Sequence, residues 1–275
     1  MTDRPFRFGV VAVPQGTGDQ WCAKARRVEE LGYDTLLMPD GLQLPSPVAA
    51  LPIAAAVTTR LRVGTFVMAS PLRAPRLAAW EAHSLSTLLD GRFELGIGTG
   101  RPEVAKQAVE LLGAPDIPPA RRLAQVEQTI DALRELEGDA HTPVMIAAGG
   151  PKSRGLAGWK ADIVVLGVGP LSSQDEVRRM ADDVREKAGK RAAEVEFAMN
   201  IFIVGEEAPA WTQQFLGTDV ETLRERDSLT MLRGTTQEMA DELRRRRDVF
   251  GTSYVTINQA FLEEAAPVVQ LLAGG

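Results

Sequence analysis

Glycines gather in short stretches of this sequence that each follow a run of apolar residues typical of a β-strand. The stretch RFELGIGTGRPEVAK at residues 92–106 contains Gly96, Gly98 and Gly100. Because glycine weakens a strand, such a cluster usually marks a backbone that another group approaches closely. We expect that group to be a phosphate or a flat ring, although a tight turn between a strand and a helix would explain the same residues.

A second pair of glycines, in the stretch AAGGPKSRG, precedes a proline at the expected start of a helix. The free backbone N–H groups of a helix start and the helix dipole both favour an anion there. Lys152 and Arg154 add positive charge to this stretch. We therefore interpret Ala148, Gly149 and Gly150 as part of a phosphate cradle, with a plain turn as the alternative.

The sequence lacks the residues that several other kinds of catalytic centre require. The sequence has one cysteine, Cys22, and two histidines, His83 and His141, and it contains neither an HExxH zinc motif nor a GxSxG nucleophile elbow. We therefore expect no protein-built metal site and no serine hydrolase. The net charge of −6 leaves no basic footprint, so we expect no nucleic-acid partner.

The composition is typical of a cytoplasmic protein. A single cysteine cannot form an internal disulfide, which fits a reducing compartment. No stretch reaches the roughly 20 apolar residues that span a bilayer, and the first residues lead directly into the strand-like segment Phe6–Val13. We expect a cytoplasmic location and no membrane partner.

Short apolar runs alternate with segments of helical periodicity along almost the whole sequence. The predicted strands are Phe8–Val13, Thr35–Met38, Leu61–Val67, Phe93–Ile97, Val144–Ala148, Ile163–Leu166, Val195–Val204 and Ser253–Ile257. The predicted helices are Asp19–Leu31, Pro47–Val57, Arg76–Leu88, Pro119–Leu136, Ser173–Lys187, Thr236–Phe250 and Glu263–Leu272. This alternation predicts a single (β/α)8 TIM barrel over residues 1–275, with an open doubly wound sheet as the alternative.

Capping residues support several of these helix boundaries. Asp19, Ser173 and Thr235 stand where N-caps are expected, and Glu238 lies three positions after Thr235, as in a capping box. Gly251 follows a long predicted helix, where a C-cap glycine is expected.

In a barrel of this kind, chemistry takes place at the carboxyl ends of the strands. Three consecutive predicted strands end in glycine-rich stretches, which are Gly98-Thr99-Gly100-Arg101, Gly149-Gly150-Pro151-Lys152 and Gly167-Val168-Gly169. Turns alone need fewer glycines, so we expect these loops to hold a ligand. GIGTG does not match the GxGxxG dinucleotide fingerprint, because its third glycine comes one position early.

Taken together, these segments resemble the luciferase-like monooxygenase family, whose members are (β/α)8 barrels that bind FMN or the deazaflavin coenzyme F420. The matching stretches are EELGYDTLLMPDG at 29–41, AAAVTTRLRVGTFV at 54–67, DGRFELGIGTG at 90–100, TPVMIAAGGPK at 142–152, ADIVVLG at 161–167, and LRGTTQEMADEL with FGTSYVTI within 232–257. The resemblance covers most of the chain and favours the F420-dependent branch.

In that branch, the strand after RVGT ends in a bulge with a cis peptide bond that involves no proline, and this bulge presses on the middle ring of the cofactor. The resemblance places the bulge at Phe66 and Val67. It also implies that Asp40 lies near the edge of the ring, with a turn-capping role as the alternative. The residues assigned to cofactor binding are Asp40, Phe66, Val67, Thr99, Gly100, Ala148, Gly149 and Gly150.

Two positions depart from the sugar-phosphate dehydrogenases of this family, which carry a histidine after the aspartate and a glutamate after GTG. Gly41 and Arg101 stand there in this chain, so we expect a different reaction. Asp40 and Arg101 are the candidate catalytic residues. Arg101 would neutralise an anionic group of the substrate or cofactor, or stabilise negative charge that develops during hydride transfer. A solvated surface arginine is the alternative.

Only GDAHTP, at residues 138–143, separates the helix before the fifth strand from that strand, whereas family members usually carry a longer insertion that roofs the site. The candidate lid is instead the long connection Glu206–Thr235, with Trp211, Phe215 and Met231, and packing is the alternative role for these apolar residues. The residues expected to form an apolar wall around the ring, or else to belong to the core, are Met38, Phe66 and Met68.

The resemblance implies an F420-dependent oxidoreductase that transfers a hydride between C5 of the deazaflavin and a small organic substrate. The scarcity of histidine and cysteine agrees with this, because the cofactor carries the chemistry. The alternatives are an FMN-dependent monooxygenase, which needs a site closed to water, and a cofactor-binding barrel without activity. The resemblance also implies a homodimer.

Overall fold

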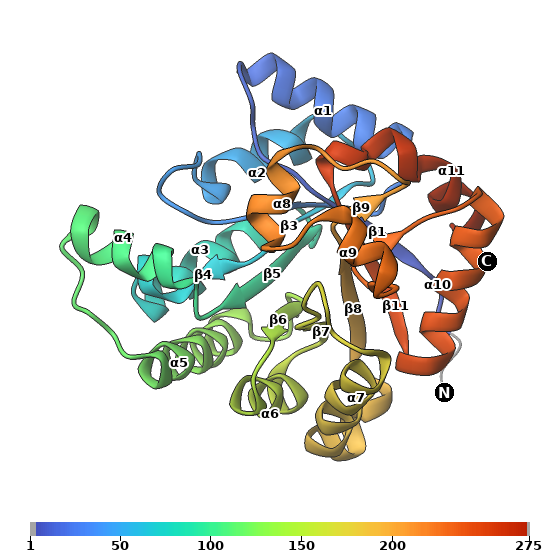
Figure 1. Ribbon diagram of the computed structural model, residues 1–275. Helices are drawn as coiled ribbons and strands as arrows, with labels where there is room; N and C mark the ends of the chain where they lie inside the picture. Colours follow the sequence, from blue (N-terminus) through green and yellow to red (C-terminus); the bar gives the residue numbers. More distant parts are fainter. Residues whose placement is uncertain (1–3, 274–275) are drawn as a thin grey trace.

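Eight parallel strands close into a barrel in the computed structural model, which describes residues 4–273 (Figure 1). Their order around the barrel is β1, β2, β3, β5, β6, β7, β8 and β11, and β11 pairs again with β1. Their bounds are Arg7–Val11, Thr35–Met38, Arg62–Thr65, Phe93–Gly98, Val144–Ala148, Ile163–Leu166, Glu196–Ile201 and Thr252–Asn258 in that order. The predicted (β/α)8 barrel is therefore confirmed, and the open doubly wound sheet is wrong.

Helices surround the barrel and cover its outer face (Figure 1). Their bounds are α1 Gly18–Glu30, α2 Pro47–Ala56, α3 Pro75–Leu88, α4 Pro102–Leu112, α5 Pro119–Glu137, α6 Pro151–Lys160, α7 Gln174–Ala188, α10 Thr236–Phe250 and α11 Leu262–Leu272. None of the helices in residues 4–273 has the length and apolar character that crossing a membrane requires.

The segment between β8 and α10 leaves the regular alternation of strands and helices. It contains β9 (Ile203–Val204), which pairs with β10 (Met231–Leu232), and the short helices α8 (Trp211–Leu216) and α9 (Val220–Glu225). Figure 1 shows α8, in orange, in front of the centre of the barrel. This is the connection in which the sequence predicts a lid.

The predicted N-cap residues are confirmed at two helices and are wrong at a third. Ser173 and Thr235 are the N-caps of α7 and α10, each within a capping box. Helix α1 begins one residue before Asp19, because Thr17 is its N-cap and Gln20 completes the box. The prediction of Asp19 as the N-cap is therefore wrong.

Strand residues alternate between two apolar layers, as the period of two along a strand requires. One layer lies inside the barrel and consists of the buried residues Leu37, Met145, Ile163, Val165, Ala198 and Tyr254. Val11 and Phe66 pack against this interior cluster and are only partly buried. Met38 and Met68 are fully buried in the other layer, outside the interior cluster. Their predicted place in the wall around a cofactor ring is therefore wrong, whereas Phe66 does face inward.

A network of buried charges occupies the amino-terminal end of the barrel. Arg7 forms ion pairs of 2.8 Å with both Glu94 and Glu196, and Arg62 pairs with Glu94 at 2.7 Å. The guanidinium of Arg7 also lies 4.2 Å from the ring centroid of Tyr254. Glu94 Oε2 has no hydrogen-bond partner in this network. Because side chains nevertheless fill this end, a ligand site belongs at the opposite, carboxyl-terminal end.

Candidate functional site

The carboxyl-terminal end of the barrel, which we call the mouth, is hollow beside β6 and β7. Ala147 is exposed although both of its neighbours in β6 are buried. It lies on the same face of the strand as Met145, which belongs to the interior cluster. An inward-facing residue of a closed barrel is exposed only where no side chain fills the space above it. The next inward positions, Gly149 and Gly167, are exposed as well.

The two glycines at the ends of β6 and β7 have different surroundings. A Cβ on Gly167 would lie 2.5 Å from the Cα of Gly149, so a side chain at position 167 would push the two strand ends apart. A Cβ on Gly149 would have no atom within 4 Å. The backbone at Gly149 is therefore open to a ligand, and Gly167 allows the strands to converge beneath it.

Helix α6 begins directly after this opening and presents free donors to it. Its N-cap is Gly150, which has no side chain to accept from the N–H groups of Lys152 and Ser153. The hydroxyl of Ser153 instead accepts from Gly150 N at 3.0 Å and donates to Gly150 O at 2.8 Å, which fixes the turn. Unpaired N–H groups at a helix N-terminus favour an anion, so the predicted phosphate cradle has suitable geometry here.

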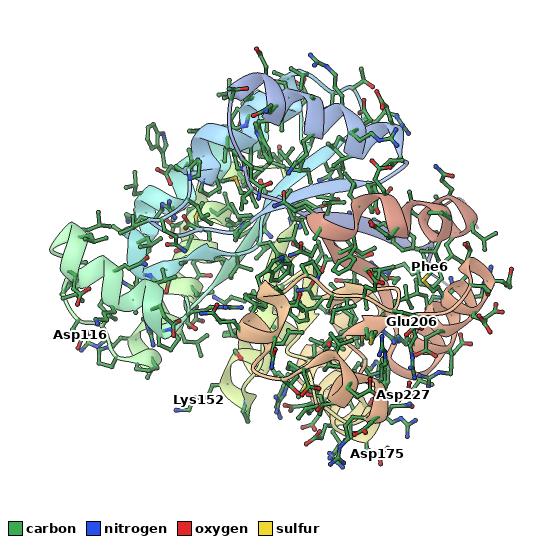
Figure 2. The ribbon with its side chains drawn as sticks, turned by 45° about the horizontal axis from the view of Figure 1, so that its top comes forward. Phe6, Asp116, Lys152, Asp175, Glu206 and Asp227 are labelled. Atoms are coloured by element: carbon green, nitrogen blue, oxygen red, sulfur yellow. The ribbon has the colours of Figure 1, made fainter. Side chains whose placement is uncertain are left out.

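The two basic residues of this segment do not both face the opening. Arg154 pairs with Asp183 at 2.7 Å and donates to the carbonyl oxygen of Gly149 at 2.7 Å. It therefore supports the loop from behind. Lys152 is exposed and extends away from the body of the protein in Figure 2. The cradle thus consists of backbone N–H groups, with Arg154 holding them in place.

A bulge interrupts the chain after β3, which is separated from β6 by β5 alone. The peptide bond between Phe66 and Val67 is cis, at the position that the resemblance predicts. The chain then continues as β4 (Met68–Ala69), which pairs with β5. The N–H of Phe66 donates to Met38 O at 2.7 Å, and both Phe66 and Val67 are partly exposed at the mouth.

Gly96 and Gly98 of β5 make room for this bulge. A Cβ on Gly96 would lie 1.9 Å from Thr65 O, and one on Gly98 would lie 2.8 Å from Val67 Cγ2. The hydroxyl of Thr65 also donates to Gly96 O at 2.6 Å. At these two positions the glycines therefore make room for a neighbouring strand. The ligand that the sequence suggested there would be affected by these glycines only through the bulge that they accommodate. Gly100 has a φ of +70°, which suits the turn into α4.

Asp40 lies at the end of β2 and holds the segment that follows the bulge. Its carboxylate, with a side chain only 4% exposed, accepts from Ala69 N at 3.0 Å and pairs with Arg73. Arg73 Nε also lies 3.2 Å from Glu81. Burial raises the pKa of Glu81, Arg73 opposes this, and the charge of Asp40 adds to it. With its oxygens engaged in this way, Asp40 has the geometry of a positioning residue.

Arg101 connects the loop after β5 to helix α8. It follows Thr99 and Gly100, which are partly exposed at the mouth, and it is the N-cap of α4. Its guanidinium carbon lies 4.5 Å from the ring centroid of Phe215, and no carboxylate among residues 4–273 pairs with it. Arg101 is exposed to solvent, as in the surface-arginine alternative, and its guanidinium is held beside the mouth by Phe215.

Aromatic contacts attach α8 to the barrel. The ring of Phe215 lies 5.6 Å from that of Phe202 and 6.1 Å from that of Trp211. Trp211 is part of α8 itself, so the contacts of Phe215 with Arg101 and Phe202 are the ones that join α8 to the β5 and β8 sides of the mouth. Met231, which the sequence grouped with the lid, is instead buried in β10 and belongs to the core.

Two residues of the mouth were not identified from the sequence. Ala147 lines the hollow, and Asn200 lies on the inward face of β8, two positions after Ala198 of the interior cluster. Asn200 Oδ1 accepts from Thr256 Oγ1 at 3.0 Å, which leaves its amide N–H groups for a ligand. The alternation within VMIAA and FAMNI was the signal that could have found both.

Comparisons with known proteins agree with this geometry. The profile of the luciferase-like monooxygenase family matches residues 6–247. An F420-dependent glucose-6-phosphate dehydrogenase of Amycolatopsis mediterranei (strain U-32) is 28% identical over 212 residues, which are 64% of this chain and 62% of that protein. A similar enzyme of Kineococcus radiotolerans is 26% identical over 219 residues, which are 68% of this chain and 64% of that protein.

Solved structures show the same fold. An F420-dependent secondary alcohol dehydrogenase, in complex with an F420-acetone adduct, superposes with a TM-score of 0.77 at 16% identity and covers 98% of both chains. A long-chain alkane monooxygenase superposes with a TM-score of 0.75 at 14% identity, over 98% of this chain and 92% of that one. With a family profile that spans most of its length and a barrel of matching topology, this chain belongs to the luciferase-like monooxygenase family.

Proposed function

We propose that this protein is an F420-dependent oxidoreductase that transfers a hydride between C5 of the deazaflavin and a small organic substrate. The observation that carries the proposal is the open backbone at Gly149, beside the uncapped N-terminus of α6 and above a hollow barrel mouth. The F420-dependent relatives support this choice of coenzyme over other anionic ligands. The side chains of the protein need only bind the coenzyme and substrate and stabilise charge, because F420 when bound supplies the hydride chemistry.

The residues at the mouth fit such a coenzyme. The N–H groups of Lys152 and Ser153 would hold its phosphate beside Gly149 and Gly150, where a Cβ on Gly149 would meet open space. The ring system would lie between the hollow at Ala147 and the bulge. The residues that border that space are Phe66, Val67, Thr99, Gly100 and Asn200. Ala148, which the sequence also assigned to the cofactor, is fully buried in the layer outside the barrel, so its side chain does not face this space.

Arg101 and Asp40 would act differently. Arg101 is exposed beside the mouth without a carboxylate partner among residues 4–273, so it would pair with an anionic group of the substrate or coenzyme, or stabilise negative charge that develops during transfer. Asp40 would position the segment after the bulge through Ala69 and Arg73. Helix α8 would exclude water from the reacting groups.

The substrate differs from a sugar phosphate in this proposal. Gly41 and Arg101 replace the histidine and glutamate that the sugar-phosphate dehydrogenases of the family carry. Neither residue can remove a proton from a sugar hydroxyl, because glycine has no side chain and arginine stays protonated. We therefore propose a small organic substrate with an anionic group opposite Arg101.

An FMN-dependent monooxygenase is the second candidate, and helix α8 is the observation in its favour. Oxygen chemistry requires a site closed to water, and α8 lies over the mouth with aromatic contacts on both sides. The two candidates differ in cofactor preference.

The test is a titration of the purified protein with F420 and, separately, with FMN, followed by fluorescence and by binding heat. The proposal expects micromolar binding of F420 and at least tenfold weaker binding of FMN. The opposite preference would favour the monooxygenase. Binding of neither would contradict the phosphate cradle and favour a barrel without activity.

We also propose a homodimer. Leu77, Trp80 and Leu88 form an exposed apolar stripe along α3, and Ile53 of the neighbouring α2 is exposed as well. Such a patch is a frequent site of association. Light scattering after size exclusion should show a dimer that Trp80→Glu weakens and that the control Trp159→Glu, on α6, leaves intact.

A further inference from the structure

A second hollow lies away from the barrel mouth, between α4 and α5 and the loop that joins them. Its volume is about 520 Å³, within the range of roughly 300–1,000 Å³ typical of small-molecule sites. Its walls are apolar at Val109, Ile117 and Pro118, and its charged lining residues are Lys106, Glu110, Asp116 and Arg122. None of these residues has a part in the proposed coenzyme site.

Arg122 is the unusual residue of this hollow. It lines the hollow, it is 9% exposed, and its Nε and Nη1 atoms are buried without a hydrogen-bond partner. No carboxylate among residues 4–273 pairs with it. A buried cation without a counter-charge is costly, so proteins normally provide a partner for it. An anion in the hollow would supply that partner.

The acidic residues nearby do not serve this purpose. Glu110 lies 3.6 Å from Lys106, in the next turn of α4. Asp116 is exposed, and Figure 2 places it at the outer edge of the molecule, on the loop after α4. The hollow therefore combines one uncompensated buried cation and apolar walls with a rim on which Lys106 and Glu110 pair with each other and Asp116 is exposed.

We propose that this hollow binds a small organic carboxylate, with the carboxylate on Arg122 and the apolar part against Val109, Ile117 and Pro118. Carboxylates match the guanidinium group well as hydrogen-bond acceptors. Arg122 offers a single positive charge, because Lys106 at the rim is paired with Glu110, so a singly charged anion matches the hollow better than a more highly charged one such as inorganic phosphate. The apolar walls favour a ligand with a hydrocarbon chain.

The position of the hollow links it to the mouth. Pro102, which follows Arg101 directly, is one of its lining residues. Ser70, in the 3₁₀ turn Ser70–Leu72 after β4, donates to Arg122 O at 3.2 Å. The residues that form the hollow are therefore in contact with both the start of α4 and the turn after the bulge.

The test measures binding of hexanoate by calorimetry and by thermal shift, with the uncharged hexanamide and inorganic phosphate as comparison ligands. The test variant is Arg122→Met, which keeps the length of the side chain without its charge. Its matched control is Arg121→Met, at an exposed neighbour on the same helix that does not line the hollow. The F420 titration is run in parallel on all three proteins.

We expect hexanoate to bind saturably to the wild type and to Arg121→Met, and at least tenfold more weakly to Arg122→Met. Hexanamide and phosphate should each bind at least tenfold more weakly than hexanoate to the wild type. The melting temperature of ligand-free Arg122→Met should equal or exceed that of the wild type, because the variant removes an unpaired buried charge. Arg122→Lys, which restores a charge, should recover part of the binding.

Several results would overturn the proposal. Absence of hexanoate binding to the wild type would do so, and so would equal binding to Arg122→Met. Tighter binding of phosphate than of hexanoate would show a plain anion site instead. A melting temperature of Arg122→Met well below that of the wild type would assign Arg122 a structural role. None of these results depends on F420 binding, so the two proposals fail separately.

Discussion

Gly167 faces Gly149 so closely that a Cβ on Gly167 would stand 2.5 Å from the Cα of Gly149. The opposite substitution meets no obstacle, because a Cβ on Gly149 would have no neighbour within 4 Å. One glycine therefore sets the spacing of β6 and β7, and the other leaves backbone exposed at the mouth. The sequence shows both simply as glycines at the ends of strands.

This asymmetry predicts different outcomes for two similar variants. Gly149→Ala should unfold with a free energy within about 0.5 kcal/mol of the wild type, because the new methyl group meets open space. Its affinity for F420 should fall at least tenfold. Gly167→Ala should lose about 1–3 kcal/mol of stability through overpacking. Urea unfolding and F420 titration measure the two quantities, and unchanged F420 binding by Gly149→Ala would contradict the cradle.

A second prediction concerns the bulge. Gly96→Ala should destabilise the protein by about 3 kcal/mol, because its methyl group would lie 1.9 Å from Thr65 O. Gly155→Ala in α6 is the control, since a Cβ there meets nothing within 4 Å. That control should gain about 0.5–1 kcal/mol, as alanine generally does in a helix. Chemical denaturation of both variants checks the contrast, and equal stabilities would contradict it.

A third prediction tests the positioning role of Asp40. Asp40→Asn should lower the stability by about 3 kcal/mol, because it leaves Arg73 largely buried with a weaker partner. The double variant with Arg73→Met should lose less than the sum of the two single losses, which a double-mutant cycle measures. F420 affinity should fall in Asp40→Asn through displacement of the Ala69 segment. Strictly additive losses would show that the pair is not coupled.

A fourth prediction concerns the contact between Arg101 and Phe215. Phe215→Ala should speed hydrogen exchange of the backbone amides in α8, because it removes the contacts of that ring with Arg101, Phe202 and Trp211. Arg101→Met should raise KM for the substrate more than it lowers kcat, because an ion pair with bound substrate is lost. Exchange in α8 that is unchanged by Phe215→Ala would argue against these contacts in solution.

A fifth prediction follows from Glu29, at the end of α1. Its carboxylate accepts from the N–H groups of Thr59, Arg60 and Leu61 at 2.9, 2.6 and 2.9 Å. Partial burial raises the pKa of this carboxyl, but the three N–H groups lower it more, so its pKa is below the ordinary value of 4.5. A carboxyl group whose pKa is lowered in the folded state stabilises the fold at pH values above its ordinary pKa. This stabilisation is lost as the pH falls through the lowered pKa. Glu29→Gln should therefore melt below the wild type at pH 7, and the difference should shrink as the pH falls below about 4.

The strands could be predicted well from the sequence because each is a continuous apolar run between turn residues. Residues 35–38 and 163–166 have the same bounds in the prediction and the structure. The short helices α8 and α9 were not predicted, since six-residue segments carry little periodicity and depend on tertiary contacts. In α8 these contacts come from Phe202, which precedes the helix, and from Arg101, which lies far away in the sequence.

The roles of individual site residues were harder to predict for a related reason. Met38 and Met68 look suited to a flat ring, but the alternation along their strands turns them away from the barrel interior. Gly96 and Gly98 look suited to a ligand, but they face a bulge in a strand that is adjacent only in space. Such pairings depend on which strands become neighbours, and no local pattern contains that information.

The charge network of Arg7, Glu94 and Glu196 has a consequence for the order of events during turnover. With this end of the barrel filled, the hollow at the mouth opens toward α8. A coenzyme bound against Ala147 would then lie beneath the substrate, and both would enter through the same opening. The coenzyme would therefore bind before the substrate and leave after the product. Steady-state kinetics should show an ordered mechanism, in which the product competes with the substrate only for protein that already holds the coenzyme.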